Sequence, residues 1–328
     1  MLLNNGDLEV LALTRDPLAQ KAKGLPSWIC SWGPTTCDLP FSDGTHVDRP
    51  FNAGGVFRPG DITVYDHEPD IICINGIRLG TVIGLTTHIE SGTELPLQRP
   101  DLPIPDWRPV STFIAETKSL CVQAILPSLM SETDIARLLV ANYEMVFQHG
   151  ADIDMPLAQS TSLSIPMPLS LSPMPYRHRC ASNGTLALSR LRAGLRWLDY
   201  AAQLVAVSEA MSQGVLTPAL MQQVGALQAL TAEVPAMMAG LSEFWCDFKP
   251  QLERRAWLSD TGFIGLGPAA MLEGDVVVVF RGSPVASVVR RIGDGGRWVL
   301  VGEAYAHGVM DGELMQGELV KVERFELE

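Results

Sequence analysis

The sequence has few basic residues and no closely spaced cysteines. Its 24 Lys and Arg are outnumbered by 37 Asp and Glu, which gives the 328-residue chain a net charge of −13. We therefore expect no nucleic-acid partner, because phosphate binding needs clustered basic side chains. The six cysteines include no CxxC pair, so the sequence indicates neither a zinc site nor a disulfide framework.

Long apolar runs are also missing. No stretch approaches the roughly 20 residues that span a bilayer, and the first ten residues lack the basic and apolar regions of a secretory signal. We expect a cytoplasmic protein with no membrane span. Hydrophobic residues make up 47% of the chain and charged residues 19%, which is typical of a folded protein.

The motifs of several enzyme classes do not occur. The sequence contains no GxxxxGK[ST], no HExxH, no GxSxG at a strand-to-helix turn and no GxGxxG after a strand. Phosphoryl transfer, zinc hydrolysis, serine hydrolysis and hydride transfer therefore lose support. We expect no cofactor and no metal ligand set.

The first part of the chain, residues 1–110, reads as β structure. Short β-prone runs at 8–14, 61–66, 70–76 and 77–87 alternate with turn-forming residues. Asn75-Gly76 lies between two of these runs and predicts a hairpin, because both residues tolerate positive φ.

The middle part, residues 111–250, reads as a helical insertion because its apolar residues recur three and four positions apart. Thr217-Pro218 is typical of an N-cap followed by proline at the first helical position. The predicted helices cover residues 111–125, 132–148, 185–213, 217–231 and 235–249.

A proline-rich, apolar loop at 151–184 interrupts these helices. A loop of this length is generally functional or disordered, and its Met, Leu and Ile content makes full solvation costly. Two interpretations remain open: a lid over a pocket, or a loop that fills a groove between subdomains.

The last part, residues 251–328, returns to a period of two with tight turns. Strands are predicted at 263–267, 275–282, 285–292, 297–308 and 318–327. This pattern predicts an antiparallel meander whose strand in 275–282 is buried on both faces. We expect an α+β fold in which N- and C-terminal strands form one antiparallel β-barrel or sheet with a helical insertion; two separate domains are the alternative.

Motifs at both ends of the chain resemble those of fungal heterokaryon-incompatibility (HET) proteins. "LPSWICSWG" at 25–33 looks like the L-P-S-W-x-x-x-W element of that family, and "VGEAYAHGVMDGE" at 301–313 looks like its closing motif. The intervening matches are Thr261, Gly262, Gly265, Gly267, Pro268, Gly274, Asp275 and Arg290.

The resemblance implies a limit on function. Family members normally carry an N-terminal HET domain, distantly similar to the nucleotide-cleaving TIR domain, that delivers a cell-death signal. We expect this chain to comprise the C-terminal region only and to lack the N-terminal HET domain. No NAD-cleaving or death-inducing activity is therefore assigned to it.

The closing motif has two interpretations. Tyr305 and His307 alternate onto one face of a predicted strand, where they either hold the last hairpin together or hydrogen-bond a ligand. Asp275, directly after Gly274, is typical of a turn acceptor rather than a catalyst.

Our first functional hypothesis is a cofactor-independent cyclase, including a Diels–Alder-type pericyclase, that acts on a hydrophobic terpenoid or polyketide. Orienting such a substrate can lower a barrier by roughly 7–11 kcal/mol, and Tyr305, His307 or Arg254 would polarise a carbonyl. The residues predicted to bind the substrate are Trp28, Trp32, Met174, Tyr176, Trp245 and Trp257.

Two other hypotheses remain. The chain is alternatively a non-catalytic accessory or recognition module of the incompatibility system, which binds a protein partner through its acidic surface. A hydrolase or isomerase with a Tyr, His and carboxylate set is the third.

Overall fold

The structure, a computed structural model, divides into two compact units. The barrel unit comprises residues 1–93, 112–141 and 250–328, and the helical unit comprises residues 94–111 and 142–249. The residues described are 8, 11, 23–29, 51–58, 60–65, 68–89, 108–124, 132–139, 143–146, 176–179, 184–214, 217–248, 251–293, 296–316 and 321–328. Residues 112–141, which the sequence places in the helical insertion, group with the barrel unit.

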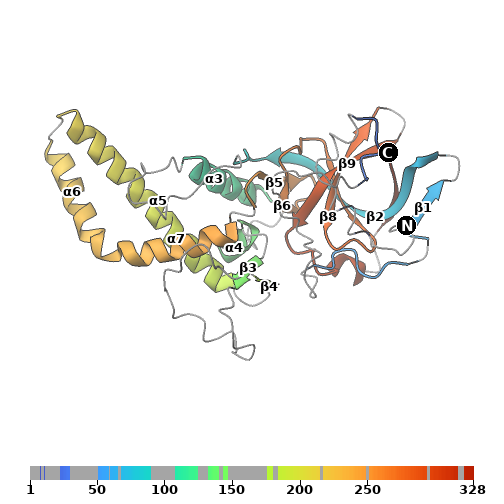
Figure 1. The fold of residues 1–328 in the computed structure, drawn as a ribbon, viewed down its shortest axis with the longest axis horizontal. Helices are drawn as coiled ribbons and strands as arrows, with labels where there is room; N and C mark the ends of the chain where they lie inside the picture. The colour runs from blue at the N-terminus through green and yellow to red at the C-terminus, as the bar shows by residue number, and fades with distance from the viewer. Residues whose placement is uncertain are drawn as a thin grey trace, which may run out of the picture. The chain divides into compact units, whose positions relative to one another are not determined.

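Strands from both ends of the chain form the eight-stranded sheet of the barrel unit (Figure 1). Hydrogen bonding runs from β2 through β5, β6, β9, β8 and β7 and back to β2, so these strands close a ring. β1 and β10 also pair with β2, and the pairings are antiparallel apart from one β10–β9 contact. The expected barrel of N- and C-terminal strands is confirmed. The strands are β1 Ile62–Tyr65, β2 Glu68–Leu85, β5 Arg254–Ser259, β6 Ile264–Pro268, β7 Val276–Phe280, β8 Ala286–Ile292, β9 Arg297–Ala306 and β10 Val322–Leu327.

The predicted hairpin at Asn75-Gly76 is wrong, because β2 runs through it without a turn. Gly76 is paired with Phe280 of β7 on one side and with Glu323 of β10 on the other. A Cβ at position 76 would lie 2.7 Å from Val278 Cγ1. The glycine therefore serves close side-chain packing between paired strands rather than a change of chain direction.

The hydrophobic core of the barrel unit joins residues that are distant in sequence. Every residue of β7 is buried, which confirms the expectation of burial on both faces. One core cluster comprises Leu8, Leu11, Ile72, Ile74, Val276, Val278, Phe280, Val289, Leu300, Phe325 and Leu327. The strand predicted at 8–14 is wrong at its described residues: Leu8 lies in a turn and Leu11 is helical, and the Leu11 amide donates to the Leu8 carbonyl. This spacing lets both leucines enter the core.

Strand β5 was missed by the sequence prediction, and it explains the glycines of the family-like motif. Trp257 of β5 is paired with Gly265 of β6 and is fully buried. A Cβ at Gly265 would lie 2.6 Å from Trp257 Cζ2 and would collide with the Tyr305 carbonyl oxygen. Gly267 leaves room for the Met271 sulfur in the same way. The glycines provide the space that the indole ring fills.

The described residues of the helical unit form a two-stranded antiparallel sheet and three consecutive helices. β3 Tyr143–Val146 pairs with β4 Tyr176–Arg179. The helices are α5 Gly184–Ser212, α6 Pro218–Leu230 and α7 Val234–Phe248, with the short 3-10 helix η4 Thr231–Glu233 before α7. Thr217 caps α6 as predicted, since its hydroxyl accepts from the Leu220 amide at 3.1 Å.

Two predictions in this region are wrong. The helix expected over 132–148 ends early: α4 spans Glu132–Leu139, and β3 follows it. The 151–184 loop was expected to lack regular structure, yet β4 lies within it. Pairing between β3 and β4 supplies backbone hydrogen bonds that local periodicity does not reveal. The rest of 151–183 lies outside the described residues. α3 spans Arg108–Gln123, close to the prediction.

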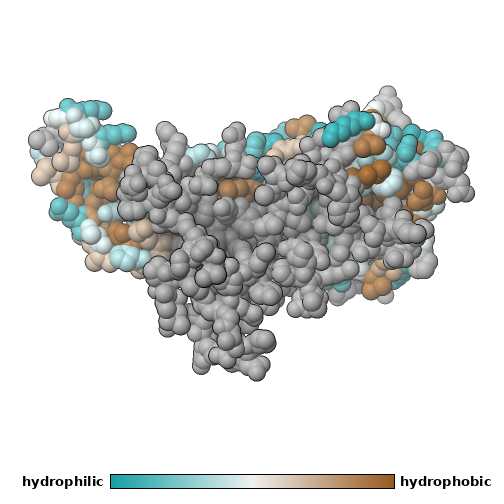
Figure 2. All heavy atoms as spheres, viewed as in Figure 1, coloured by the Kyte–Doolittle hydropathy of each residue, from teal (hydrophilic) through white to brown (hydrophobic). Residues whose placement is uncertain are grey.

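One helical segment is long and apolar enough to cross a membrane. Pro218–Leu241 reaches a mean hydropathy of 1.2, and 17% of its apolar window is buried. The sequence prediction treated its two helices separately and therefore found no such run. Length and composition alone do not distinguish a membrane span from an apolar helix of a soluble protein. Figure 2 shows apolar side chains gathered over this part of the helices.

A matched pair of glycine substitutions tests the packing of Trp257. We expect Gly265→Ala to destabilise the barrel unit by about 1–3 kcal/mol, because the added methyl group meets the indole and the Tyr305 backbone. Gly225→Ala in α6 adds a methyl group with no atom within 4 Å, and we expect it to stabilise the helix by about 0.5–1 kcal/mol. Urea unfolding followed by tryptophan fluorescence and circular dichroism measures both. Equal effects of the two substitutions would contradict this packing.

Candidate functional site

Tyr305 and His307 lie at the end of β9 and face the same side, as predicted. The Tyr305 hydroxyl lies 3.0 Å from His307 Nδ1. The His307 amide donates to the Ile264 carbonyl, and Gly308 turns the chain at a φ of +82°. The sheet and this turn therefore fix both rings.

Helix α4 supplies the two remaining members of a cluster that we call the Tyr–His–Asp cluster: Tyr305, His307, Asp134 and Arg137. Asp134 Oδ1 lies 3.7 Å from His307 Nε2 and 3.6 Å from an Arg137 guanidinium nitrogen. The cluster thus joins a helix to a strand about 170 residues later in the sequence. Sequence reasoning missed Asp134 and Arg137, which carried no motif.

Burial decides the protonation of the cluster. Desolvation of the Tyr305 side chain, which is 2% exposed, raises the pKa of its hydroxyl well above the ordinary range. Desolvation lowers the pKa of His307 although Asp134 acts in the opposite direction. The nearby Asp134 carboxylate favours a proton on Nε2, so Nδ1 accepts from the Tyr305 hydroxyl. The arrangement orients a neutral histidine but leaves the phenol a weak acid.

Arg254, the third predicted catalytic residue, is engaged by a buried carboxylate. A guanidinium nitrogen of Arg254 donates to Glu303 Oε1 at 2.7 Å, and the two side chains are 4% and 9% exposed. Arg254 lies on β5 and Glu303 on β9, so the ion pair reaches across β6. Glu303 precedes Tyr305 by two positions and lies on the same face of β9.

The predicted substrate-binding residues are distributed over both units. Trp28 is partly buried against the Phe325-containing core, and its indole nitrogen donates to the Asp70 carbonyl at 3.1 Å. Trp257 lies in the packing of β5 against β6. Tyr176 is in β4 and Trp245 in α7, but their side chains lie outside the described part of the chain, as do Trp32 and Met174 entirely.

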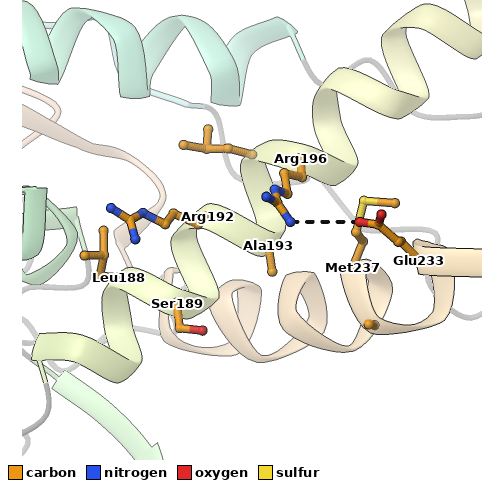
Figure 3. Close-up of a pocket in the computed structure, with 9 residues that line it drawn as sticks. Leu188, Ser189, Arg192, Ala193, Arg196, Glu233 and Met237 are labelled. Carbon is orange, nitrogen blue, oxygen red and sulfur yellow. Dashed lines mark ion pairs between the residues drawn. The ribbon is translucent and has the colours of Figure 1, made fainter. Parts of the chain in front are cut away.

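A pocket of about 630 Å³ lies in the helical unit, and the sequence prediction missed it. α5, η4 and α7 line it, and none of its described lining residues was predicted to bind substrate (Figure 3). The lining comprises Leu188, Ser189, Arg192, Ala193, Leu195, Arg196, Glu233, Ala236 and Met237. The spacing of Arg192 and Arg196, one helical turn apart, is the signal that could have indicated it.

Two further groups have structural roles. Asp275 accepts from the Leu272 amide at 2.8 Å, which confirms the predicted turn acceptor. It also pairs with Arg290 through both carboxylate oxygens, at 2.7 and 2.9 Å, and this hydrogen bonding raises the pKa of Arg290. Among the described residues, no three His, Cys, Asp or Glu side chains gather as a metal site requires.

Comparison with known proteins identifies the C-terminal region. Residues 196–325 match the family described as "Het-6 beta-barrel domain". A 63-residue stretch is 44% identical to "Heterokaryon incompatibility protein 6, OR allele" of Neurospora crassa. Over this region the chain is thus similar to HET-family proteins.

The Neurospora match is partial. It covers 19% of this chain and 9% of the Neurospora protein. No solved structure matches the chain. The Het-6 match includes β5 to β9 and most of β10 but neither β1 nor β2, so the strand that closes the ring lies outside it.

The pKa of His307 predicts a pH dependence of stability. Its folded-state pKa lies below the unfolded value of about 6.5. His307 therefore contributes stability that is complete above pH 6.5 and is lost as the pH falls through the lowered value, by at most about 1.4 kcal/mol per pH unit. We expect His307→Asn to flatten this acid-side slope in urea unfolding between pH 7.5 and 5. His88, which is exposed, gives a matched control. If His88→Asn changes the pH dependence of the unfolding free energy as much as His307→Asn does, the attribution of that dependence to His307 is contradicted.

The buried ion pair of the barrel unit can be tested with a double-mutant cycle. We expect Arg254→Met to cost about 3–5 kcal/mol, because it removes the charge partner of buried Glu303. The double change Arg254→Met with Glu303→Leu should recover most of that loss, since no buried charge then remains at the pair. Lys321→Met at the exposed Lys321–Glu323 pair should change stability by less than about 1 kcal/mol. Urea unfolding measures the free energy of each variant. If the double variant loses as much stability as the two single variants lose together, this account is contradicted.

Proposed function

We propose that this chain acts as a non-catalytic recognition module of a heterokaryon-incompatibility protein, with the Het-6 barrel as its rigid core. The proposal rests on how the side chains with catalytic potential are bonded within residues 196–325. Tyr305 and His307 are bonded to each other, and Arg254 is bonded to Glu303. These groups stabilise the contact of α4 and β5 with β9 rather than present reactive atoms to a ligand.

The printed name of the Neurospora relative supports the biological setting. That protein is called a heterokaryon-incompatibility protein and is designated by an allele. In this chain the strands of the matched region close a ring with β2, and such a rigid frame suits discrimination between variants because it holds surface differences in fixed positions. The acidic net charge of −13 suits a partner with a basic surface.

Cyclisation, our first hypothesis from the sequence, has less support. A hydroxyl that polarises a substrate carbonyl must reach the substrate, whereas the Tyr305 side chain is 2% exposed. The Phe51 ring lies 5.9 Å from the Tyr305 ring and helps to cover it. The described pocket lies on other residues, in the helical unit.

A chimaera in Neurospora crassa tests the proposal. The segment of heterokaryon incompatibility protein 6 that corresponds to residues 196–325 is replaced by that of this chain, and growth of fused mycelia is scored. We expect incompatibility to persist, also with Tyr305→Phe, because the phenylalanine ring keeps the packing against Phe51 and loses only the hydroxyl. We expect Gly265→Val to abolish it by disrupting the barrel.

Protein levels decide between the interpretations. Loss of incompatibility in the Tyr305→Phe chimaera at a normal protein level would contradict a purely structural role of the hydroxyl, since the fold is then retained and the function depends on the hydroxyl itself. An inert unmutated chimaera that accumulates like the parent would contradict the proposed equivalence of the two barrel regions.

A further inference from the structure

The pocket of the helical unit has the size and lining of a site for a small amphiphile. Its volume of about 630 Å³ falls within the roughly 300–1,000 Å³ of small-molecule sites. Most of its wall is apolar, with Leu188, Ala193 and Leu195 from α5 and Ala236 and Met237 from α7. Met237 is 5% exposed, and its flexible thioether adapts to an apolar ligand.

Two helices approach each other closely at Ala193, one of the residues that line the pocket. A Cβ at Gly240 of α7 would collide with the Ala193 Cβ of α5, so the backbones meet at small residues. The larger Leu188 and Met237 lie to either side of this contact and define a hollow next to it (Figure 3). The hollow is therefore a consequence of residue sizes along two packed helices.

Positive charge is concentrated at this hollow. Residues 184–248 contain three basic residues, Arg190, Arg192 and Arg196, all in the first half of α5, whereas the chain as a whole is acidic. Arg192 and Arg196 leave α5 one turn apart and both line the pocket (Figure 3). In Figure 3 the guanidinium group of Arg192 lies toward Leu188 and that of Arg196 toward Glu233. Both side chains are long and flexible and leave the same helix one turn apart, so they can turn toward each other and bind one carboxylate through charge-assisted hydrogen bonds.

Arg196 is only loosely engaged by Glu233. The nearest atoms of the pair are 3.9 Å apart, and the two side chains are 73% and 56% exposed. Such a pair contributes little in water. A ligand carboxylate that approaches with its apolar body already in the hollow can displace Glu233 from Arg196.

We propose that this pocket binds a long-chain monocarboxylate, with the carboxylate at Arg192 and Arg196 and the hydrocarbon chain in the hollow beside the contact of α5 with α7. This inference goes beyond the proposed recognition function and does not depend on it. It gives the helical unit a ligand site of its own, for an anionic amphiphile.

Calorimetric titration of the full chain with dodecanoate tests the proposal. We expect saturable binding of one dodecanoate per chain. Arg192→Gln with Arg196→Gln should weaken it at least about tenfold, as loss of charge-assisted hydrogen bonds predicts. Glu233→Gln should strengthen it about two- to fivefold, because the competing carboxylate is removed. Ala236→Phe should abolish binding by filling the apolar wall.

Two controls make the outcome decisive. Arg190→Gln removes the same charge from the same helix at a residue that does not line the pocket, and it should leave the affinity unchanged. Dodecanol, which lacks the charge, should bind more weakly than dodecanoate and equally to the wild-type chain and the double arginine variant. Absence of saturable binding at millimolar dodecanoate, equal weakening by Arg190→Gln, or equal affinity for dodecanol and dodecanoate would overturn the proposal. Circular dichroism checks that each variant is folded.

Discussion

The barrel unit depends on one long strand. β2 pairs with β1 and β10 along its first half, with β7 at its centre and with β5 at its end. No other described strand pairs with four partners. β2 comes from the N-terminal part of the chain, whereas β5 to β10 come from the last 75 residues, so ring closure requires contacts across about 200 residues. The loop-closure entropy of bringing these segments together is offset by burial of the shared core.

Ring closure positions the polar side chains that sequence reasoning singled out. Because β5, β6 and β9 are held side by side, Arg254 can reach Glu303 across β6, and the indole of Trp257 can lie over Gly265 and Gly267. The same arrangement presents His307 to Asp134 of α4. The motif from Tyr305 to His307 looks like an active site in the sequence, but in the fold each of its polar groups has a structural partner. The apolar pocket with its two arginines lies in the helical unit.

Local signals were sufficient for most elements and insufficient for long-range pairing. The Thr217 cap, α5, α7 and the strands from β6 to β10 follow from residues near each element. The hairpin prediction at Asn75-Gly76 failed because side-chain packing of β7 overrides turn propensity. β5 was missed since Arg254 and Arg255 interrupt its apolar pattern, and their partners, Glu303 and the Thr86 carbonyl, are remote in sequence. Asp134 could not be assigned to the site, because only the fold brings it to His307.

Native-state hydrogen exchange of the chain with Ile77→Pro tests the role of β2 most directly. Ile77 is paired with Val279 of β7 and Val322 of β10, and proline in a central strand removes a donor from the sheet. If β2 closes the barrel, amides of β5, β7, β8 and β9 lose protection together in the variant, whereas those of α5, α6 and α7 keep it. Protection retained in β7 to β9 would show that the C-terminal strands fold without β2 and would contradict this account.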